Sequence, residues 1–301
     1  MPVLPVPDIV VEARQLTKHF GPVVAVEELD FDVRRGEVFG FLGPNGAGKT
    51  TTIRLCLDLV RPTSGSVRVL GGTGRDLVVR RRIGYLPGDL RLDARYTAAE
   101  VIAFFGALRG GVDEAAVKQL LERFDLDPNR PVGELSTGNR RKVGIVQAFA
   151  HRPELLILDE PTAGLDPLLQ YEFQQVLRQA VDDGATVFLS SHILPEVEVL
   201  ADRVGILRRG QLVAVAGIDD LRAQARQRID FHVPGTADVA VFGGLPEVVS
   251  LTTAENVVQV VVEGSVDRVL KAAAGLEVRR IVTHEADLEE VFLGYYRNDL
   301  T

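Results

Sequence analysis

A glycine-rich loop that ends in lysine and threonine lies near the start of the chain, directly after a short apolar segment, residues 38–42. Glycine has no Cβ, so the backbone of such a loop can approach an anion closely and point successive N–H groups at its oxygens. A helix that continues the loop would direct the positive end of its dipole at the same anion. The loop reads Gly43-Pro44-Asn45-Gly46-Ala47-Gly48-Lys49-Thr50 and continues at Thr51.

This order of strand, loop and helix predicts a site for the phosphates of a nucleotide. Lys49 supplies a positive charge for the β- and γ-phosphates, and Thr50 supplies a hydroxyl for Mg²⁺. The loop and the residues around it therefore predict a nucleotide with its phosphates and Mg²⁺ as ligands. Since kinases, GTPases and transport ATPases all use such a loop, it does not by itself separate these enzymes.

Two adjacent carboxylates follow the run Leu155–Leu158, which has the continuous apolar pattern of a buried parallel strand. Ligands of open α/β sheets bind at the carboxyl ends of the strands, where Asp159 and Glu160 stand. Neighbouring residues of a strand point to opposite sides, so the two acids take different tasks. We expect Asp159 to hold Mg²⁺ through water and Glu160 to polarise the water that attacks the γ-phosphate. The alternative is a solvated acidic turn after a core strand.

Between these two motifs lies the segment Leu135-Ser136-Thr137-Gly138-Asn139. It resembles the Leu-Ser-Gly-Gly-Gln signature of ABC ATPases, with Thr137 and Asn139 as departures. The resemblance implies an α/β fold of the P-loop NTPase (ABC ATPase) type with a helical subdomain. It continues through the acid pair, a stretch like the D-loop and a stretch like the switch histidine of that family: Asp159-Glu160, Gly164-Leu165-Asp166 and Ser190-Ser191-His192.

The residue types of the signature also predict a second anion site. Ser136 is a good N-cap, Gly138 leaves backbone N–H groups exposed, and the helix that follows presents its positive end. The resemblance implies that this site binds the γ-phosphate held by the loop of the opposite subunit, so that ATP is sandwiched in a homodimer. Alternatively, Ser136 simply caps an amphipathic helix.

The resemblance implies roles for three further residues. His192 follows the expected strand Thr186–Leu189 and would hydrogen-bond the γ-phosphate, although a lone histidine is often structural. Phe20 matches the aromatic residue that stacks on adenine, and an ordinary core phenylalanine is the alternative. Asp166, in the stretch like the D-loop, would belong to the nucleotide site.

One residue that the family usually carries is absent. After the expected strand Ile83–Pro87 the family places a glutamine that touches Mg²⁺ and the attacking water, whereas this chain has Gly88-Asp89. We expect nucleotide binding to survive this departure and hydrolysis to be slow. Asp89 is the rival, since its carboxylate could take the position of the glutamine.

Charge and hydropathy limit the partners of the chain. Its net charge of −8, from 34 lysines and arginines against 42 acidic residues, argues against nucleic acid. No apolar run approaches the roughly 18 residues of a membrane helix, and the first eight residues do not resemble a signal peptide. The resemblance therefore implies a separate integral membrane permease as partner, and a cytoplasmic location, peripheral on the inner face of the cell membrane.

The chain divides into two expected parts. Residues 1–226 read as the ABC ATP-binding domain with a mainly helical insert at about 89–150, and the charged segment 219–228 reads as its closing helix. Residues 227–301 read as a small C-terminal α+β accessory domain. Its expected strands and helices are residues 229–233, 257–262 and 278–282, and residues 266–274 and 286–296.

The tail Asp287–Leu293 resembles the ending of ATPase subunits of daunorubicin-resistance-type and related exporters, whose permease is a separate chain. Any amphipathic helix that packs on a sheet would show a similar stripe. We therefore expect an ATP-hydrolysing subunit of an ABC exporter. The alternatives are a soluble ABC ATPase acting on ribosomes or DNA, which usually carries two P-loop domains or a coiled-coil insert, and a slow nucleotide switch, suggested by Gly88.

Overall fold

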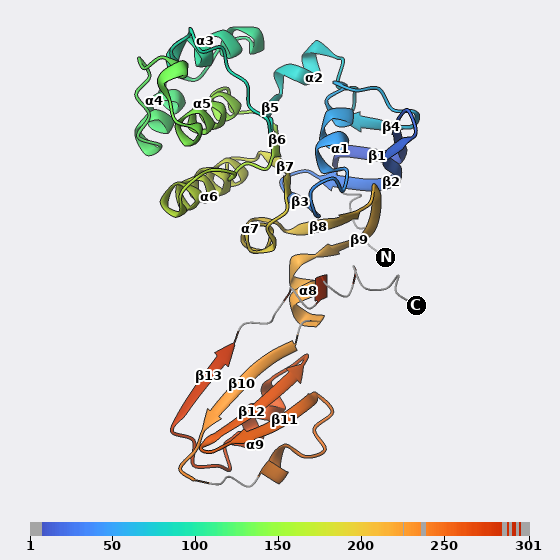
Figure 1. The fold of residues 1–301 in the computed structure, drawn as a ribbon, viewed down its shortest axis with the longest axis vertical. Helices are drawn as coiled ribbons and strands as arrows, with labels where there is room; N and C mark the ends of the chain where they lie inside the picture. Colours follow the sequence, from blue (N-terminus) through green and yellow to red (C-terminus); the bar gives the residue numbers. More distant parts are fainter. Residues whose placement is uncertain are drawn as a thin grey trace, which may run out of the picture. The chain divides into compact units, whose positions relative to one another are not determined.

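The computed structural model describes residues 8–224, 226–235 and 239–284 and the single positions 288, 291, 292 and 295 (Figure 1). Residues 1–7, and most of the tail over which a helix was expected (286–296), lie outside the described residues. The chain forms two compact units, Met1–Val215 and Ala216–Thr301. Among the described residues no helix has both the length and the apolar composition needed to cross a membrane.

A six-stranded sheet in the order β5-β6-β7-β3-β8-β9 is the centre of the first unit (Figure 1). Every residue of β3, β6 and β7 is buried, which is why these strands are apolar throughout. Parallel pairing joins β5, β6, β7, β3 and β8, so their carboxyl ends meet at one edge. The strands are β3 Val38–Leu42, β5 Ile83–Leu86, β6 Leu155–Asp159, β7 Thr186–Ser191, β8 Arg203–Arg208 and β9 Gln211–Gly217.

A three-stranded antiparallel sheet packs against the six-stranded one through a cluster of phenylalanines. Phe31 comes from the three-stranded sheet, and Phe39, Phe41 and Phe188 come from β3 and β7. Their ring centroids lie 4.8 to 6.0 Å apart. The sheet has the order β2-β1-β4 and comprises β1 Ile9–Phe20, β2 Val23–Arg34 and β4 Ser64–Val69.

Helices α3, α4 and α5 gather at one end of this unit, in the part of the chain that was expected to be a helical insert (Figure 1). Thr97 and Glu100 form a capping box at the start of α3, and Ser136 caps α5. The helices of the unit are α1 Lys49–Cys56, α2 Leu77–Arg81, α3 Ala98–Arg109, α4 Glu114–Arg123, α5 Thr137–Phe149, α6 Pro167–Asp182 and α7 Leu194–Leu200.

The second unit is an antiparallel sheet in the order β11-β12-β10-β13, whose apolar face packs on α9 and a short 3-10 turn. This is the strand order of a ferredoxin-like split β-α-β fold, with the 3-10 turn at the place of its first helix. The elements are α8 Ile218–Gln224, β10 Arg226–His232, η2 Val239–Phe242, β11 Val248–Ala254, β12 Val257–Glu263, α9 Asp267–Ala273 and β13 Arg280–His284.

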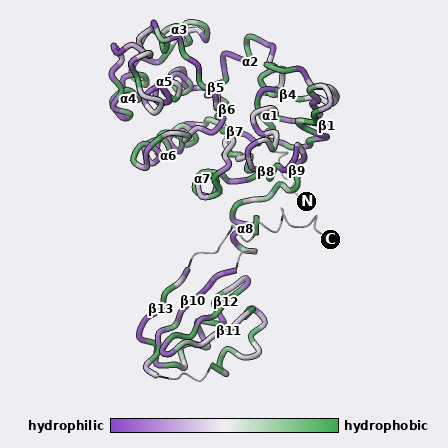
Figure 2. The backbone as a smooth tube through the Cα atoms, in the orientation of Figure 1, coloured by the Kyte–Doolittle hydropathy of each residue, from purple (hydrophilic) through white to green (hydrophobic). Residues whose placement is uncertain are grey.

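Two details of this unit differ from the sequence analysis. The closing helix expected over 219–228 ends at Gln224, and the hydrophilic residues Arg226–Arg228 open strand β10 instead (Figure 2). They pair with Val261–Glu263, so backbone hydrogen bonds to β12 override the helical preference of a charged segment. Strand β11 was not expected, because its pattern of mixed polar residues is weak. The division of the chain falls at Val215, and a domain boundary at 226 stays a prediction.

The phenylalanine cluster yields a stability prediction. Phe41 is fully buried, so Phe41→Ala should lower the free energy of unfolding by about 3 to 5 kcal/mol, through lost burial and an unfilled cavity. Leu168→Ala, at a side chain 80% exposed, is the control and should stay within about 0.5 kcal/mol of the parent. Urea unfolding measures both. A loss below about 1 kcal/mol for Phe41→Ala would show that the cluster does not hold the two sheets together.

Candidate functional site

The phosphate-binding loop connects β3 to α1, and the fold itself requires glycine at two of its positions. A Cβ on Gly43 would lie 2.4 Å from the carbonyl oxygen of Leu207, and one on Gly48 would lie 2.7 Å from that of Ala25. Gly48 also has a φ of 107°, in the left-handed region that favours glycine. Side chains at these positions would push the loop away from the strands that support it.

The side chain of Lys49 folds back onto the phosphate-binding loop, and only 5% of it is exposed. Its Nζ donates hydrogen bonds to the carbonyl oxygens of Gly43 at 2.6 Å and Pro44 at 3.2 Å. The first N–H groups of α1 have no partner within the helix, so the loop, the helix and the Lys49 ammonium together favour the binding of an anion. The turn of the loop consists of Pro44, Asn45, Gly46 and Ala47, and Thr50 and Thr51 follow in the first turn of α1.

Two hydroxyl groups fix Asp159 at the carboxyl end of β6. Ser190 Oγ donates to Asp159 Oδ1 at 2.6 Å, and Thr50 Oγ1 donates to the same oxygen at 3.1 Å. Asp159 is only 1% exposed, and Ser190 is its direct neighbour in the pairing of β6 with β7. The structure thus brings together the two residues that were predicted to bind the metal.

The oxygen atoms of Thr50 and Asp159 fit Mg²⁺. This ion keeps several waters and takes only one or two protein carboxylates beside the phosphates of its substrate. A cluster of three or more histidine, cysteine or acidic residues that would hold a metal is not found in the described part of the chain. A magnesium site made of Thr50, Asp159 and the phosphates of a nucleotide agrees with this ligand preference and with the absence of such a cluster from the described residues.

Glu160 has a backbone conformation that residues other than glycine rarely adopt. Its φ is 49°, and its N–H donates to the carbonyl oxygen of Ser190 at 3.1 Å and to the Ser190 hydroxyl at 3.2 Å. Conformations of this kind cost of the order of 1 to 3 kcal/mol, persist only where the surroundings hold them, and cluster at functional sites. The strain at Glu160 therefore supports a functional role.

The Glu160 carboxylate lies between two groups that were predicted to contact the phosphate. Its Oε1 is 3.3 Å from Lys49 Nζ, and its Oε2 is 2.7 Å from His192 Nδ1. His192 directly follows β7, so its ring reaches Glu160 from the adjacent strand. Three residues that are distant in sequence therefore meet at the edge of the sheet, beside the phosphate-binding loop.

The signature segment lies beside the stretch that resembles the D-loop. Ser136 Oγ accepts a hydrogen bond from the N–H of Asn139 at 3.2 Å, as an N-cap of α5. A Cβ on Gly138 would lie 3.2 Å from the carbonyl oxygen of Gly164, and Asp166, two residues further on, caps α6. Within the described part of one chain, neither Ser136 nor Gly138 has a hydrogen bond to the phosphate-binding loop.

Phe20 ends β1 with 49% of the residue exposed, so it is not a core residue. Lys18 Nζ lies 4.9 Å from the centroid of its ring. A cation on an aromatic face stabilises the exposed ring by about 0.5 to 1 kcal/mol. The contact of Phe20 with adenine stays a prediction.

Gly88 allows the loop after β5 to pass close to Asp159. A Cβ at this position would lie 3.0 Å from Asp159 Oδ2, which is tighter than ordinary van der Waals contact. The rival residue Asp89 forms an ion pair with Arg91 at 2.9 Å, and 64% of its side chain is exposed. Glycine therefore leaves Asp159 undisturbed but provides no side chain beside it.

Two residues of the site were given no role by the sequence analysis. Ser190 holds both Asp159 and the backbone of Glu160, and its only signal is a hydroxyl at the carboxyl end of an apolar strand. Arg141 is 4% exposed and donates to carbonyl oxygens of the loops after β5 and β6. It stands in a run of three basic residues, a pattern that usually indicates a solvated surface.

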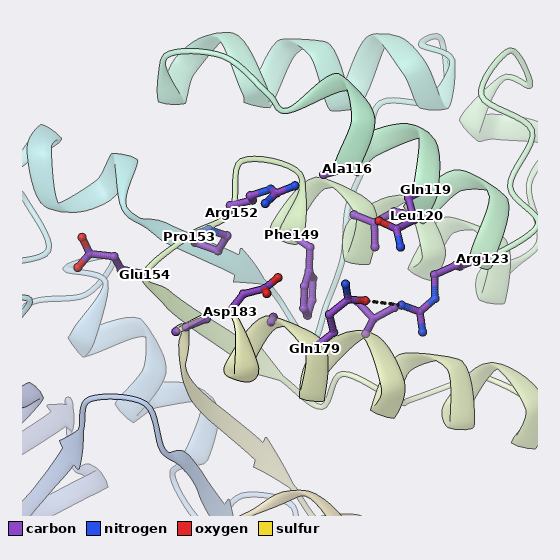
Figure 3. Close-up of a pocket in the computed structure, with 14 residues that line it drawn as sticks. Ala116, Gln119, Leu120, Arg123, Phe149, Arg152, Pro153, Glu154, Gln179 and Asp183 are labelled. Atoms are coloured by element: carbon purple, nitrogen blue, oxygen red, sulfur yellow. Dashed lines mark hydrogen bonds between the residues drawn. The ribbon is translucent and has the colours of Figure 1, made fainter.

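A separate cavity of about 240 Å³ lies between α4, α6 and the segment 152–154 (Figure 3). Arg123 of α4 connects this helix to α6, since it donates a hydrogen bond to Gln179 Oε1 at 3.0 Å and forms an ion pair with Glu172 at 3.2 Å. None of the residues predicted for the nucleotide site line this cavity. It belongs to the packing between the helical part and α6.

Comparison with known proteins identifies the family. Residues 26–163 match the family described as ABC transporter. The chain is 38% identical over 229 residues to the bacitracin transport ATP-binding protein BcrA of Bacillus licheniformis, covering 74% of this chain and 75% of that protein. It is 34% identical over 301 residues to the Nod factor export ATP-binding protein I of Mesorhizobium japonicum, covering 95% of this chain and 86% of that protein.

A solved ATP-binding subunit of an ABC transporter matches with a TM-score of 0.66 and 32% identity, covering 71% of this chain and 92% of that one. With this fold, these motifs and these relatives, the chain belongs to the family of ABC transporter ATP-binding proteins.

Proposed function

We propose that this chain binds ATP with Mg²⁺, hydrolyses it in a head-to-tail homodimer and thereby drives export through a separate membrane permease. The observation that carries the proposal is the Glu160 carboxylate between Lys49 and His192, beside the phosphate-binding loop. The relatives named for bacitracin transport and Nod factor export support a transport role. With a permease as partner, the chain would lie on the cytoplasmic face of the cell membrane.

The residues divide the reaction among them. Lys49 and the loop amides bind the β- and γ-phosphates. Thr50 and Asp159 would hold Mg²⁺, which would supply positive charge to neutralise part of the phosphate charge. A γ-phosphate carries more negative charge than a carboxylate, so it draws Lys49 and His192 away from Glu160. The Glu160 carboxylate can then accept a proton from the attacking water while His192 orients the phosphate.

The signature supports a dimer. The amides at the start of α5 form an anion site, and the phosphate-binding loop of the same chain makes no described hydrogen bond to Ser136 or Gly138. A second copy in the opposite orientation would place Ser136 and Gly138 on the γ-phosphate held by the first copy. Two equivalent composite sites then form, with the Gly164 carbonyl next to each signature and Asp166 two residues further along the chain.

A groove of about 490 Å³ next to α2, β5 and α3 supports the permease as partner. Leu59, Leu77 and Leu108 line it although each is more than half exposed. Exposed apolar side chains that are concentrated in one groove are typical of a protein contact site. The rim also carries Arg80 and Arg81, so a permease segment with apolar anchors and acidic residues would fit.

An ABC ATPase that acts on ribosomes or DNA is not supported. Both relatives are named for transport or export. The net charge of −8 also opposes binding to a polyanion.

The first prediction concerns the general base. Glu160→Gln should keep ATP binding nearly intact, lower turnover by about two orders of magnitude or more, and accumulate an ATP-bound dimer. Hydrolysis assays and size-exclusion chromatography with ATP measure these effects. Glu122→Gln, at a side chain 69% exposed on α4, is the control and should change neither. Wild-type turnover in Glu160→Gln would remove this residue from the mechanism.

The second prediction concerns the composite site. Ser136→Arg and Lys49→Ala should each abolish hydrolysis, yet their mixture should regain part of it, because one of the two composite sites in a mixed dimer is whole. A mixture of Lys49→Ala with Glu160→Gln should stay inactive, since both substitutions affect the subunit that holds the phosphates, and both sites are then damaged. The absence of rescue over a range of mixing ratios would contradict the shared site.

The third prediction concerns Gly88. Gly88→Ala should lower turnover and raise the Mg²⁺ concentration needed for half-maximal activity, because its Cβ crowds Asp159. Gly88→Gln crowds Asp159 equally but adds an amide near the attacking water, so it should turn over about tenfold faster than Gly88→Ala, equivalent to about 1.4 kcal/mol. Equal rates for the two variants would show that the amide does not assist. A large loss of ATP hydrolysis in Asp89→Asn would instead show that Asp89 takes the place of the glutamine beside the attacking water.

A further inference from the structure

A buried arginine on α5 links the signature helix to both loops that carry the proposed metal and water site. Arg141 is 4% exposed, and all three of its guanidinium nitrogens donate hydrogen bonds to backbone carbonyl oxygens. A guanidinium has five N–H donors in a rigid plane, so it can bind several carbonyl oxygens at once. The compact ammonium of a lysine could not reach all of them. No step of the proposed reaction uses this residue.

The five carbonyl acceptors belong to two segments, the loop after β5 and the end of β6 with the loop that follows it. Nη1 donates to Pro87 at 2.7 Å and to Gly88 at 3.3 Å, in the loop after β5. Nη2 donates to Asp159, the last residue of β6, at 2.7 Å and also to Glu160, and Nε donates to Pro161 at 3.2 Å; Glu160 and Pro161 belong to the loop after β6. The single guanidinium therefore fixes the distance between these loops.

The contacts of Nη2 act on the strained residue itself. The carbonyl groups of Asp159 and Glu160 belong to the two peptide units on either side of the Glu160 Cα, so holding both restrains the backbone rotation that gives φ its value of 49°. Ser190 holds the N–H of the first of these peptide units. Arg141 and Ser190 together supply the restraint that a left-handed glutamate needs.

The charge of Arg141 persists although the group is buried. Burial lowers the pKa of the guanidinium to about 10, while the carboxylates of Asp159 and Glu160 raise it. At neutral pH the side chain thus remains a cation, which strengthens its hydrogen bonds to carbonyl oxygens.

Arg141 also belongs to the same helix as the signature. Ser136 caps α5 and Arg141 lies in its second turn, so a rigid displacement of the start of α5 moves the guanidinium with it. We propose that Arg141 is a positioning residue that holds Glu160 in its working backbone conformation and couples that conformation to the position of the signature. This inference rests on the proposed ATP hydrolysis.

Arg141→Met tests the proposal, because it keeps an unbranched side chain and removes every donor. We expect kcat for ATP hydrolysis to fall about 100-fold, as for a misplacement of about 1 Å, while KM stays within about twofold because the phosphate-binding loop is untouched. Arg141→Lys, which keeps the charge and one donor group, should recover about tenfold over Arg141→Met. Rates are expressed per molecule that binds a fluorescent ATP analogue, so unfolded protein does not contribute.

Arg203→Met is the matched control. Arg203 is a mostly buried arginine, with 15% of its side chain exposed, and it pairs with Asp32 and Glu37 at the start of β8, the opposite end of the sheet from the reacting groups. Its loss should lower the melting temperature but leave kcat per binding-competent molecule within about twofold of the wild type.

Three outcomes would overturn the inference. Arg141→Met could retain wild-type kcat, or its kcat and KM could change only as they do in Arg203→Met. If Arg141→Met yields no folded protein, a wild-type kcat in Arg141→Lys decides against the inference. Failure of the proposed function looks different, because the wild-type chain would then not hydrolyse ATP, or Glu160→Gln would hydrolyse it at the wild-type rate.

Discussion

The parallel pairing of β3, β6 and β7 is the constraint on which the nucleotide site depends. Asp159 stands opposite Ser190, and Leu42, the last residue before the phosphate-binding loop, stands opposite Ser191. Because parallel strands end at the same edge, Thr50 and Asp159 meet although they are 109 positions apart in sequence. A shift of one residue in this register would separate Asp159 from Ser190, whose hydroxyl donates to the Asp159 carboxylate and accepts from the N–H of Glu160.

The site combines backbone strain with charged contacts. The left-handed conformation of Glu160 is unfavourable by itself, and hydrogen bonds to both of its flanking peptide units offset that cost. The carboxylate of the same residue contacts both Lys49, through Oε1, and His192, through Oε2. Strain, charge and hydrogen bonding thus meet at one residue, through contacts from two helices, α1 and α5, and from the end of β7.

Much of the first unit could be predicted from the sequence, and less of the second. The continuous apolar runs before Gly43 and Asp159 identified two central strands, because strands buried on both faces have no polar alternation. In the second unit, Arg226–Arg228 looked helical, and the mixed polar residues of Val248–Ala254 gave no strand signal. Both segments acquire their structure from pairing with β12, which no local pattern reveals.

The sequence by itself determined the phosphate-binding loop, the acid pair and the family, because their requirements are local: glycine where a Cβ would collide, and acids at the end of a buried strand. Only the tertiary structure decided the contacts of Ser190 and Arg141, and the close approach of Gly88 to Asp159. Arg141 lies in a basic run that reads as a solvated surface, yet it is buried among carbonyl oxygens from two distant loops. The physical reason is that the burial and partners of a polar side chain depend on which segments fold against it, and this information is not contained in its own neighbours along the chain.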